Sequence, residues 1–246
     1  MRIYKVREDI KYKDTREFFA NRAEKYNVEN PYSVTMYQDG NPDLVKRRNE
    51  KETEVLLPKL QLSKSSRILD IACGIGRWAD AVNVDIDKYT GVDFSEELIE
   101  IARKRNQKEN FSFYQGSAAE LEKVIQKNEK EVAYNVVLVI GLQIYLNDSD
   151  METLFQQICR LCDNGAIVCL REPVAINERL TLKEFYSEAL KENYNAIYRT
   201  REEHMKIYDM VLEKEGFTLL EEGFLYQEET LNNRKETAQY YWIYRR

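Results

Sequence analysis

The chain has 246 residues, of which 43% are hydrophobic and 33% are charged, and its formal net charge is −6 at pH 7. This length predicts one elaborated domain, the 17 Tyr and 9 Phe exclude an intrinsically disordered chain, and the negative charge disfavours general nucleic-acid binding. No apolar run approaches the ~20 residues of a membrane span, and the amino terminus lacks the apolar segment of a signal peptide. We therefore expect a soluble, cytoplasmic protein without a nucleic-acid partner or a membrane span.

Residues 1–60 have a mostly helical pattern, which is interrupted at Asn30-Pro31 and at Gly40-Asn41-Pro42. We expect this segment to form a helical cap that packs on the rest of the same domain. Its tyrosines are expected either to form a lid over a bound ligand or to pack in the core of the cap: Tyr26, Tyr32 and Tyr37.

Short apolar strands alternate with amphipathic helices from residue 67 onward. The run Val136-Val137-Leu138-Val139-Ile140 is typical of a strand that is buried on both faces. Ser95 is expected to cap a helix that has glutamates in its first turn and Lys or Arg in its last turn. Strict alternation predicts a doubly wound α/β sheet that is mostly parallel. The expected strands cover 67–72, 89–93, 111–115, 136–140 and 166–170.

The end of the chain departs from this alternation. Residues 217–220 and 240–244 predict a terminal antiparallel hairpin, with a turn-rich connection at 231–235. These two strands bring the expected sheet to seven strands, covered at one end by the N-terminal helical cap.

The four cysteines do not predict a metal site. Cys159 and Cys162 form a CxxC, but a second pair is missing and the only histidine is His204. A structural zinc site needs four ligands. Because the two cysteines also lie one turn apart in an apolar helical segment, we expect reduced core cysteines and no metal.

A glycine-rich turn follows the first expected strand. Gly74, Gly76 and Ala79 match the pattern G-x-G-x-x-G/A, which lets the backbone turn tightly and approach a nucleotide cofactor. Asp93 ends the second strand, where a carboxylate can hold a ribose diol. Asp70 distinguishes two cofactors, because a carboxylate at this turn repels the pyrophosphate of NAD but attracts the sulfonium and ammonium groups of S-adenosylmethionine.

With these features the chain resembles the class I S-adenosylmethionine-dependent methyltransferases over about 67–246. The terminal hairpin is also typical of these enzymes and unusual in dehydrogenases. The resemblance depends on four segments in order, each at the end of an expected strand: Leu69-Asp70-Ile71-Ala72-Cys73-Gly74-Ile75-Gly76-Arg77, Gly91-Val92-Asp93-Phe94-Ser95, Gln115-Gly116-Ser117-Ala118 and Val139-Ile140-Gly141-Leu142-Gln143-Ile144-Tyr145-Leu146.

The resemblance implies a Rossmann-like fold, S-adenosylmethionine as the cofactor and S-adenosylhomocysteine as its product. It divides the single domain, residues 1–246, into the cap (1–60), a cofactor-binding core (67–172), an acceptor-side insert (173–216) and the terminal hairpin (217–246). The residues that it places at the cofactor are Asp70, Gly74, Gly76, Arg77, Asp93, Phe94, Ser117, Ala118, Ile140 and Gln143.

Carried over by position, these residues have distinct expected roles. The two glycines pass under the cofactor, and Asp93 takes the ribose hydroxyls. Ser117 and Ala118 border the adenine, and Ser117 stands where many family members have an aspartate. Ile140 and Gln143 are expected to lie along the methionine side.

The methyl acceptor is expected to be an oxygen or nitrogen atom of a small molecule or glycan. A hydroxyl acceptor needs a general base, whereas an amine needs only to be neutral. Glu172, at the end of the fifth strand, is either a base, a substrate anchor or a member of an ordinary ion pair. His204 is the only imidazole, and it is either a base or a surface residue at the start of a helix.

The insert contains the aromatic and cationic run Tyr194-Asn195-Ala196-Ile197-Tyr198-Arg199. This run suits a sugar or a phosphate-bearing molecule, because tyrosines stack and arginine binds anions. The alternative is a helix-to-helix connection packed by its two tyrosines. The residues expected at the acceptor are Tyr145, Arg171, Tyr198 and Arg199.

The sequence is also compatible with other functions. The Gly74-Ile75-Gly76-Arg77 segment and the aromatic last strand also look similar to protein amino-terminal methyltransferases. A protein that binds S-adenosylmethionine without turnover is a further alternative, and a dehydrogenase is the most distant. An enclosed aromatic pocket would favour a small-molecule acceptor, and an acidic rim would favour a peptide.

Overall fold

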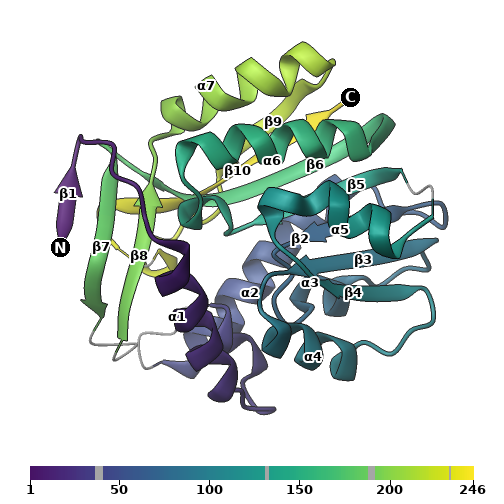
Figure 1. The fold of residues 1–246 in the computed structure, drawn as a ribbon, viewed down its shortest axis with the longest axis horizontal. Helices are drawn as coiled ribbons and strands as arrows, with labels where there is room; N and C mark the ends of the chain where they lie inside the picture. Colours follow the sequence, from purple (N-terminus) through teal and green to yellow (C-terminus); the bar gives the residue numbers. More distant parts are fainter. Residues whose placement is uncertain (37–40, 131–132, 188–191, 233) are drawn as a thin grey trace.

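The computed structural model describes residues 1–36, 41–130, 133–187, 192–232 and 234–246 (Figure 1). Its main sheet has seven strands in the spatial order β4-β3-β2-β5-β6-β10-β9. The strands are β2 (Arg67–Ile71), β3 (Lys88–Asp93), β4 (Phe111–Gln115), β5 (Tyr134–Ile140), β6 (Cys162–Ala175), β9 (Thr218–Phe224) and β10 (Thr237–Arg245).

The strand order confirms the predicted doubly wound sheet. The chain runs outward from β2 through β3 to β4 and then returns to the other side of β2 with β5, and these pairs are all parallel. β10 is inserted antiparallel between β6 and β9, which confirms the terminal hairpin. In open α/β sheets ligands bind where the strand order reverses, so this order places a crevice at the carboxyl ends of β2 and β5.

Helices cover both faces of the sheet (Figure 1). Alternate residues of β5 enter separate cores: Val137 and Val139 belong to one hydrophobic cluster, and Val136 and Leu138 belong to the other. This division explains why the strand is a continuous apolar run, since side chains alternate between faces and both faces are buried. The first core includes α5 (Leu121–Asn128), α6 (Asp148–Leu161) and α7 (Arg201–Val211), and the second includes α2 (Pro42–Leu56), α3 (Arg77–Ala81) and α4 (Glu96–Arg105).

The cap is helical except at its start. After α1 (Tyr12–Glu24) and the 3-10 turn η1 (Pro31–Val34), α2 begins at Pro42, where Asn41 caps the helix through Asp43 N at 3.1 Å. Both proline breaks therefore start helical elements.

A second sheet joins two strands of the insert to the N-terminal strand. β1 (Arg2–Tyr4), β7 (Leu180–Ser187) and β8 (Glu192–Tyr198) form three antiparallel strands beside the main sheet (Figure 1). The run beginning at Tyr194 is thus a strand, and the helix-to-helix connection considered from the sequence is wrong. Tyr194, Ala196 and Tyr198 alternate on one buried face, which packs against Phe18 of α1. This period of two is typical of a strand.

The cysteines are buried and free. Since α6 ends at Leu161, Cys162 is the first residue of β6 and does not share the helix with Cys159, contrary to the expectation from their spacing. Both contribute to the first core.

Candidate functional site

A cavity opens at the carboxyl ends of β2, β3 and β5. Its empty volume is about 1160 Å³ when the open mouth is included. The strand ends form one wall, the cap contributes another, and β6 and β10 close the inner end. The lining residues expected from the sequence are Asp70, Gly74, Arg77, Asp93, Phe94, Ile140, Tyr145, Arg171 and Tyr198.

The glycine turn after β2 has a left-handed backbone. The φ angles are +62° at Ala72, +55° at Gly74 and +77° at Gly76, a region that favours glycine. Gly74 lines the cavity, and a Cβ there would come within 2.7 Å of the Thr35 methyl group. Gly76 does not line the cavity; a Cβ on it would lie 2.7 Å from the Asn106 amide nitrogen. Gly76 therefore lies close to Asn106, the residue after α4, and to Phe113 of β4; its place under the cofactor stays a prediction.

Asp93 ends β3 with its carboxylate turned back to the glycine turn. Its Oδ2 accepts from Gly74 N at 2.9 Å, and its Oδ1 accepts from Ser95 N at 3.0 Å. Burial raises the pKa of Asp93 to about 6, although these backbone donors oppose the shift. Because each oxygen has one protein donor and the residue lines the cavity, both oxygens retain a lone pair for a pair of ligand hydroxyls.

Asp70 lies on the floor of the same cavity. Burial raises the pKa of its carboxyl group to about 7, and the Tyr89 hydroxyl donates to Asp70 Oδ2 at 2.5 Å. Asp70 is thus a second buried acidic group beside Asp93, and each becomes negatively charged above its raised pKa. In that ionised form the pair favours a positively charged ligand and disfavours a pyrophosphate.

Aromatic side chains enclose the cavity from the cap side. Phe19 of α1 packs edge-on against Phe94 at 5.7 Å and against Tyr145 at 5.2 Å between ring centroids. All three rings line the cavity. Phe19 was not predicted from the sequence, which led us to consider tyrosines of the cap as the lid.

The expected tyrosine lid is not at the cavity. The Tyr32 hydroxyl donates to Asp80 at 2.9 Å, and Arg105 donates to the Tyr26 hydroxyl at 3.2 Å. These contacts hold the cap against α3 and α4, and Tyr37 lies outside the described residues.

Besides Gly76, three residues assigned to the cofactor by resemblance are absent from the described lining of the cavity. Ser117 instead caps a turn by accepting from Ala119 N at 3.3 Å, next to Ala118. Gln143 is fully buried, and its Oε1 accepts from the Tyr208 hydroxyl at 2.8 Å on the α7 side of the sheet. The structure thus turns the Gln143 side chain away from the site.

Glu172 is also turned away from the cavity. It is fully buried, and its Oε1 accepts from Leu142 N at 2.8 Å and from Gln143 N at 2.9 Å. Arg171 and Pro173 line the cavity, so the residue between them points to the other face of β6. Burial raises the pKa of Glu172 to about 7. The placement corrects its expected role as a base: Glu172 fixes the backbone of the loop after β5.

We expect Glu172→Gln to retain these backbone hydrogen bonds while it removes a titratable group from the core. The folded protein keeps the Glu172 proton up to about pH 7, whereas the unfolded chain releases it near pH ~4.3. The stability that this group contributes is therefore present at low pH and is lost as the pH rises through about 7. Relative to wild type, the variant should gain about 2–3 kcal/mol in free energy of unfolding between pH 5 and pH 8, measured in urea. If the free energy of unfolding of the variant differs from that of wild type by the same amount at pH 5 and at pH 8, this assignment is contradicted.

His204 lies in the core between α7 and the main sheet. It is fully buried, its ring is 5.2 Å from that of Trp242, and its Nδ1 lies 3.1 Å from the Tyr208 hydroxyl. Burial, together with the positive charge of Arg199, lowers the pKa of His204 well below its ordinary value. Because His204 does not line the cavity, the expectation of a general base is wrong.

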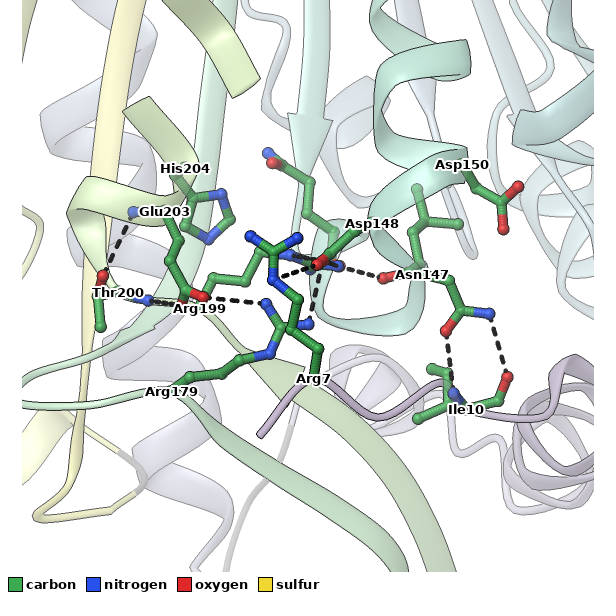
Figure 2. Close-up of polar contacts among 12 residues, drawn as sticks. Arg7, Ile10, Asn147, Asp148, Asp150, Arg179, Arg199, Thr200, Glu203 and His204 are labelled. Atoms are coloured by element: carbon green, nitrogen blue, oxygen red, sulfur yellow. Dashed lines mark hydrogen bonds and ion pairs between the residues drawn. The ribbon is translucent and has the colours of Figure 1, made fainter. Parts of the chain in front are cut away.

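Arg199 belongs to a buried ion-pair network next to His204 (Figure 2). Its Nε donates to Asp148 Oδ1 at 2.7 Å, and its guanidinium also donates to the carbonyls of Gln143 and Leu146 at 2.8 and 2.6 Å. Arg179 Nη2 donates to the same Asp148 oxygen at 3.0 Å. Arg199 was expected to contact the acceptor. The structure shows instead that its guanidinium fixes the turn that contains Tyr145.

The N-terminal segment is tied to the same turn (Figure 2). Ile10 N donates to Asn147 Oδ1 at 2.9 Å, and the Asn147 amide donates back to the Ile10 carbonyl at 3.3 Å. Arg7 Nε lies 3.6 Å from Asp148 Oδ2. These contacts place the start of α1, and with it Phe19, over the cavity.

Two charged residues of α2 were missed by sequence reasoning. Arg48 and Glu52 line the cavity and lie on the buried face of the helix with Val45 and Leu56. Their spacing follows the helical period. The sequence therefore contained one indication of their position: two charged residues stand among apolar residues on the same helix face. Glu52 binds Arg77 through its Oε1 and Arg171 through its Oε2, both at 2.5 Å.

Two features are absent from the described parts of the chain. No group of three or more His, Cys, Asp or Glu residues is arranged there to hold a metal ion. None of the described helices combines the length and the apolar character that crossing a membrane requires.

Comparison with known proteins agrees with the fold and with the glycine turn. A family model described as a methyltransferase domain matches residues 68–165. The demethylmenaquinone methyltransferase of Lactococcus lactis subsp. lactis (strain IL1403) is 34% identical over 110 residues, which span 42% of this chain and only 40% of that relative.

Solved structures with a similar fold include two N-methyltransferases. Phosphoethanolamine N-methyltransferase 1 of Haemonchus contortus has a TM-score of 0.65 at 18% identity, over 96% of this chain and 50% of that one. N-methyltransferase NodS of Bradyrhizobium japonicum WM9, in complex with S-adenosylhomocysteine, has a TM-score of 0.59 at 14% identity, over 94% of this chain and 98% of that one. With the strand order and the glycine turn, these findings show a class I, Rossmann-like methyltransferase fold, with a match to a methyltransferase domain over residues 68–165.

Proposed function

We propose that this protein binds S-adenosylmethionine in the cavity and transfers its methyl group to a nitrogen or oxygen atom of a small molecule. The observation that carries the proposal is the pair of buried carboxylates, Asp70 and Asp93, on either side of the Gly74 turn. This donor set fits the cofactor, because Asp93 keeps acceptors for two ribose hydroxyls and the negative charge of the pair favours a cation.

The residues of the cavity provide binding and exclusion of water. When bound, the cofactor supplies an electrophilic methyl group on a sulfonium. Asp93 holds the ribose, and the rings of Phe19, Phe94 and Tyr145 shield the reacting atoms from solvent. Methyl transfer is an in-line displacement, and its rate gains most from the positioning of the two reacting molecules. The rigid turn around Tyr145 supplies such positioning.

Nitrogen is the favoured acceptor atom. A hydroxyl acceptor needs a base, and both candidate bases, Glu172 and His204, are buried away from the cavity. A neutral amine needs none. The similarity to two N-methyltransferases is consistent with this choice.

The lining of the cavity favours a small molecule over a peptide. Phe19 of α1, Met36 of the cap, Tyr198 and Tyr226 line it. A pocket lined by aromatic and apolar side chains is typical of small-molecule sites. The protein or peptide methyltransferase considered from the sequence is the less favoured alternative.

Calorimetry with the purified protein tests the proposal. S-adenosylmethionine and S-adenosylhomocysteine should both bind, with NAD binding far more weakly, because Asp70 repels a pyrophosphate. Tighter binding of NAD would overturn the cofactor assignment. A mass-spectrometric screen of extract metabolites for a methyl gain then separates an enzyme from a protein that binds the cofactor without turnover.

A further inference from the structure

Two polar side chains of β10 line the cavity far from Asp93. They are Thr237 and Gln239, which share one face of the strand because they are two residues apart. In the sheet β10 follows β6, so four strand spacings of about 4.8 Å each separate it from β3, which carries Asp93. A cofactor with its ribose at Asp93 leaves this side of the cavity for the methyl acceptor.

The orientation of the Gln239 amide is fixed by Arg171. Arg171 Nη1 donates to Gln239 Oε1 at 3.2 Å. Because arginine has donors and no acceptor, the amide oxygen must face it, and the amide nitrogen points elsewhere. Arg171 is held in turn, since its guanidinium binds Glu52 Oε2 at 2.5 Å. A buried ion pair therefore presets the direction of the amide.

Each of the two side chains keeps one polar atom that the protein does not use. Gln239 Nε2 and Thr237 Oγ1 have no hydrogen-bond partner in the parts of the chain that the structure describes. Thr237 is only 2% exposed. Buried polar groups in proteins are nearly always hydrogen-bonded. An N–H donor and a hydroxyl without protein partners, side by side on the wall of a cavity, therefore indicate contact with a bound molecule.

We propose that Gln239 and Thr237 select the methyl acceptor by hydrogen bonds to an oxygen atom that it carries near the reacting nitrogen. Gln239 Nε2 donates to that oxygen, and the Thr237 hydroxyl donates to an ether or carbonyl oxygen or accepts from a hydroxyl. This inference rests on the proposed function and narrows it: the acceptor is a small amine that carries a hydroxyl, ether or carbonyl oxygen.

The selection follows from what an amine without the oxygen would leave unpaired. An alkyl amine of the same size fills the same space, but the Gln239 N–H and the Thr237 hydroxyl then lose the partner that water would otherwise give them. Sites that hydrogen-bond a substrate group reject analogues without it for this reason. Because both side chains are neutral, they distinguish amines by the oxygen and not by charge.

The test compares two pairs of amines in the protein saturated with S-adenosylhomocysteine: ethanolamine with propylamine, and 2-methoxyethylamine with butylamine. The members of a pair are similar in size and are both protonated at pH ~7, so they differ mainly in the oxygen. Affinities are measured by ligand-observed NMR titration. Wild type should bind the oxygen-bearing member of at least one pair about three- to ten-fold more tightly, the range expected of one neutral hydrogen bond.

Two variants remove the polar groups and keep the size of the side chains. Gln239→Met and Thr237→Val should each lower the ratio of affinities within a pair towards equal binding. A general loss of structure would weaken both members of a pair alike and leave this ratio unchanged. The matched control is Gln126→Met, because Gln126 is exposed on α5, and it should keep the wild-type ratio.

The outcomes separate this inference from the proposed function. The inference is overturned if wild type binds the alkyl member of both pairs as tightly as the oxygen-bearing one, or if both variants keep the wild-type ratio. A lower ratio in one variant alone supports it and identifies the side chain that contacts the oxygen; if one variant does not fold, the other decides. S-adenosylhomocysteine affinity is measured in the same samples. Its absence would contradict the proposed function, whereas its presence without a preference between amines contradicts this inference alone.

Discussion

Asp148→Ala is expected to lower the free energy of unfolding by about 3–5 kcal/mol, the usual cost of removing one partner from a buried ion pair. Arg199 is fully buried and, among the described residues, would keep the backbone carbonyls of Gln143 and Leu146 as hydrogen-bond partners. Arg179 would lose the same carboxylate. Urea unfolding of both proteins at pH 7 measures the difference.

The matched control is an exposed ion pair. Glu120→Ala removes a carboxylate that pairs with Lys123 at 2.8 Å on the surface, and such exposed pairs contribute little to stability. If Asp148→Ala costs no more than this control, the network in Figure 2 is not a structural anchor for the turn that contains Tyr145. A double variant with Arg199→Met should recover part of the loss, since it removes the uncompensated charge.

Asp93→Asn is expected to weaken binding of S-adenosylhomocysteine by roughly 30- to 150-fold, which corresponds to about 2–3 kcal/mol for hydrogen bonds to a charged group. Asparagine has one acceptor oxygen, so either a ribose hydroxyl or the Gly74 amide loses its partner. Asp93→Ala would also leave two backbone N–H groups without acceptors, those of Gly74 and Ser95. The asparagine variant is therefore the cleaner measurement, made by calorimetry.

Asp85→Asn is the control, because Asp85 is exposed in the turn before β3 and the charge change is identical. It should bind the cofactor product as wild type does. Wild-type affinity in Asp93→Asn would remove the ribose role from Asp93.

Features that depend on local sequence could be predicted. The glycine turn, the cap at Ser95 and the position of Asp93 all follow a strand directly, and the structure shows a side-chain oxygen of Ser95 accepting from Leu98 N at 3.2 Å. The pattern of apolar residues also predicted the strands of the main sheet. Val136–Ile140, for example, is apolar on both faces. The insert was misjudged because Tyr194–Tyr198 is short, and its period of two is masked by the buried Ile197.

The surroundings of buried polar and charged residues could not be predicted in the same way, although two local patterns were informative. His204 shares a helix face with Ile207, Tyr208 and Val211, a spacing that already favours the core over a catalytic site. Arg48 and Glu52 lie on the buried face of α2, but the pattern does not say which side chains they meet.

The sequence by itself determined the fold class, the glycine turn and Asp93, because strand, turn and helix follow one another along the chain and their geometry is local. Only the tertiary structure decided which face of β6 meets the cavity. It turned Arg171 inward to Glu52, 119 residues away (171 − 52), and Glu172 outward to the loop after β5. Neighbouring residues on a strand must point to opposite faces, but which face becomes the site depends on the helices that pack against each side of the sheet.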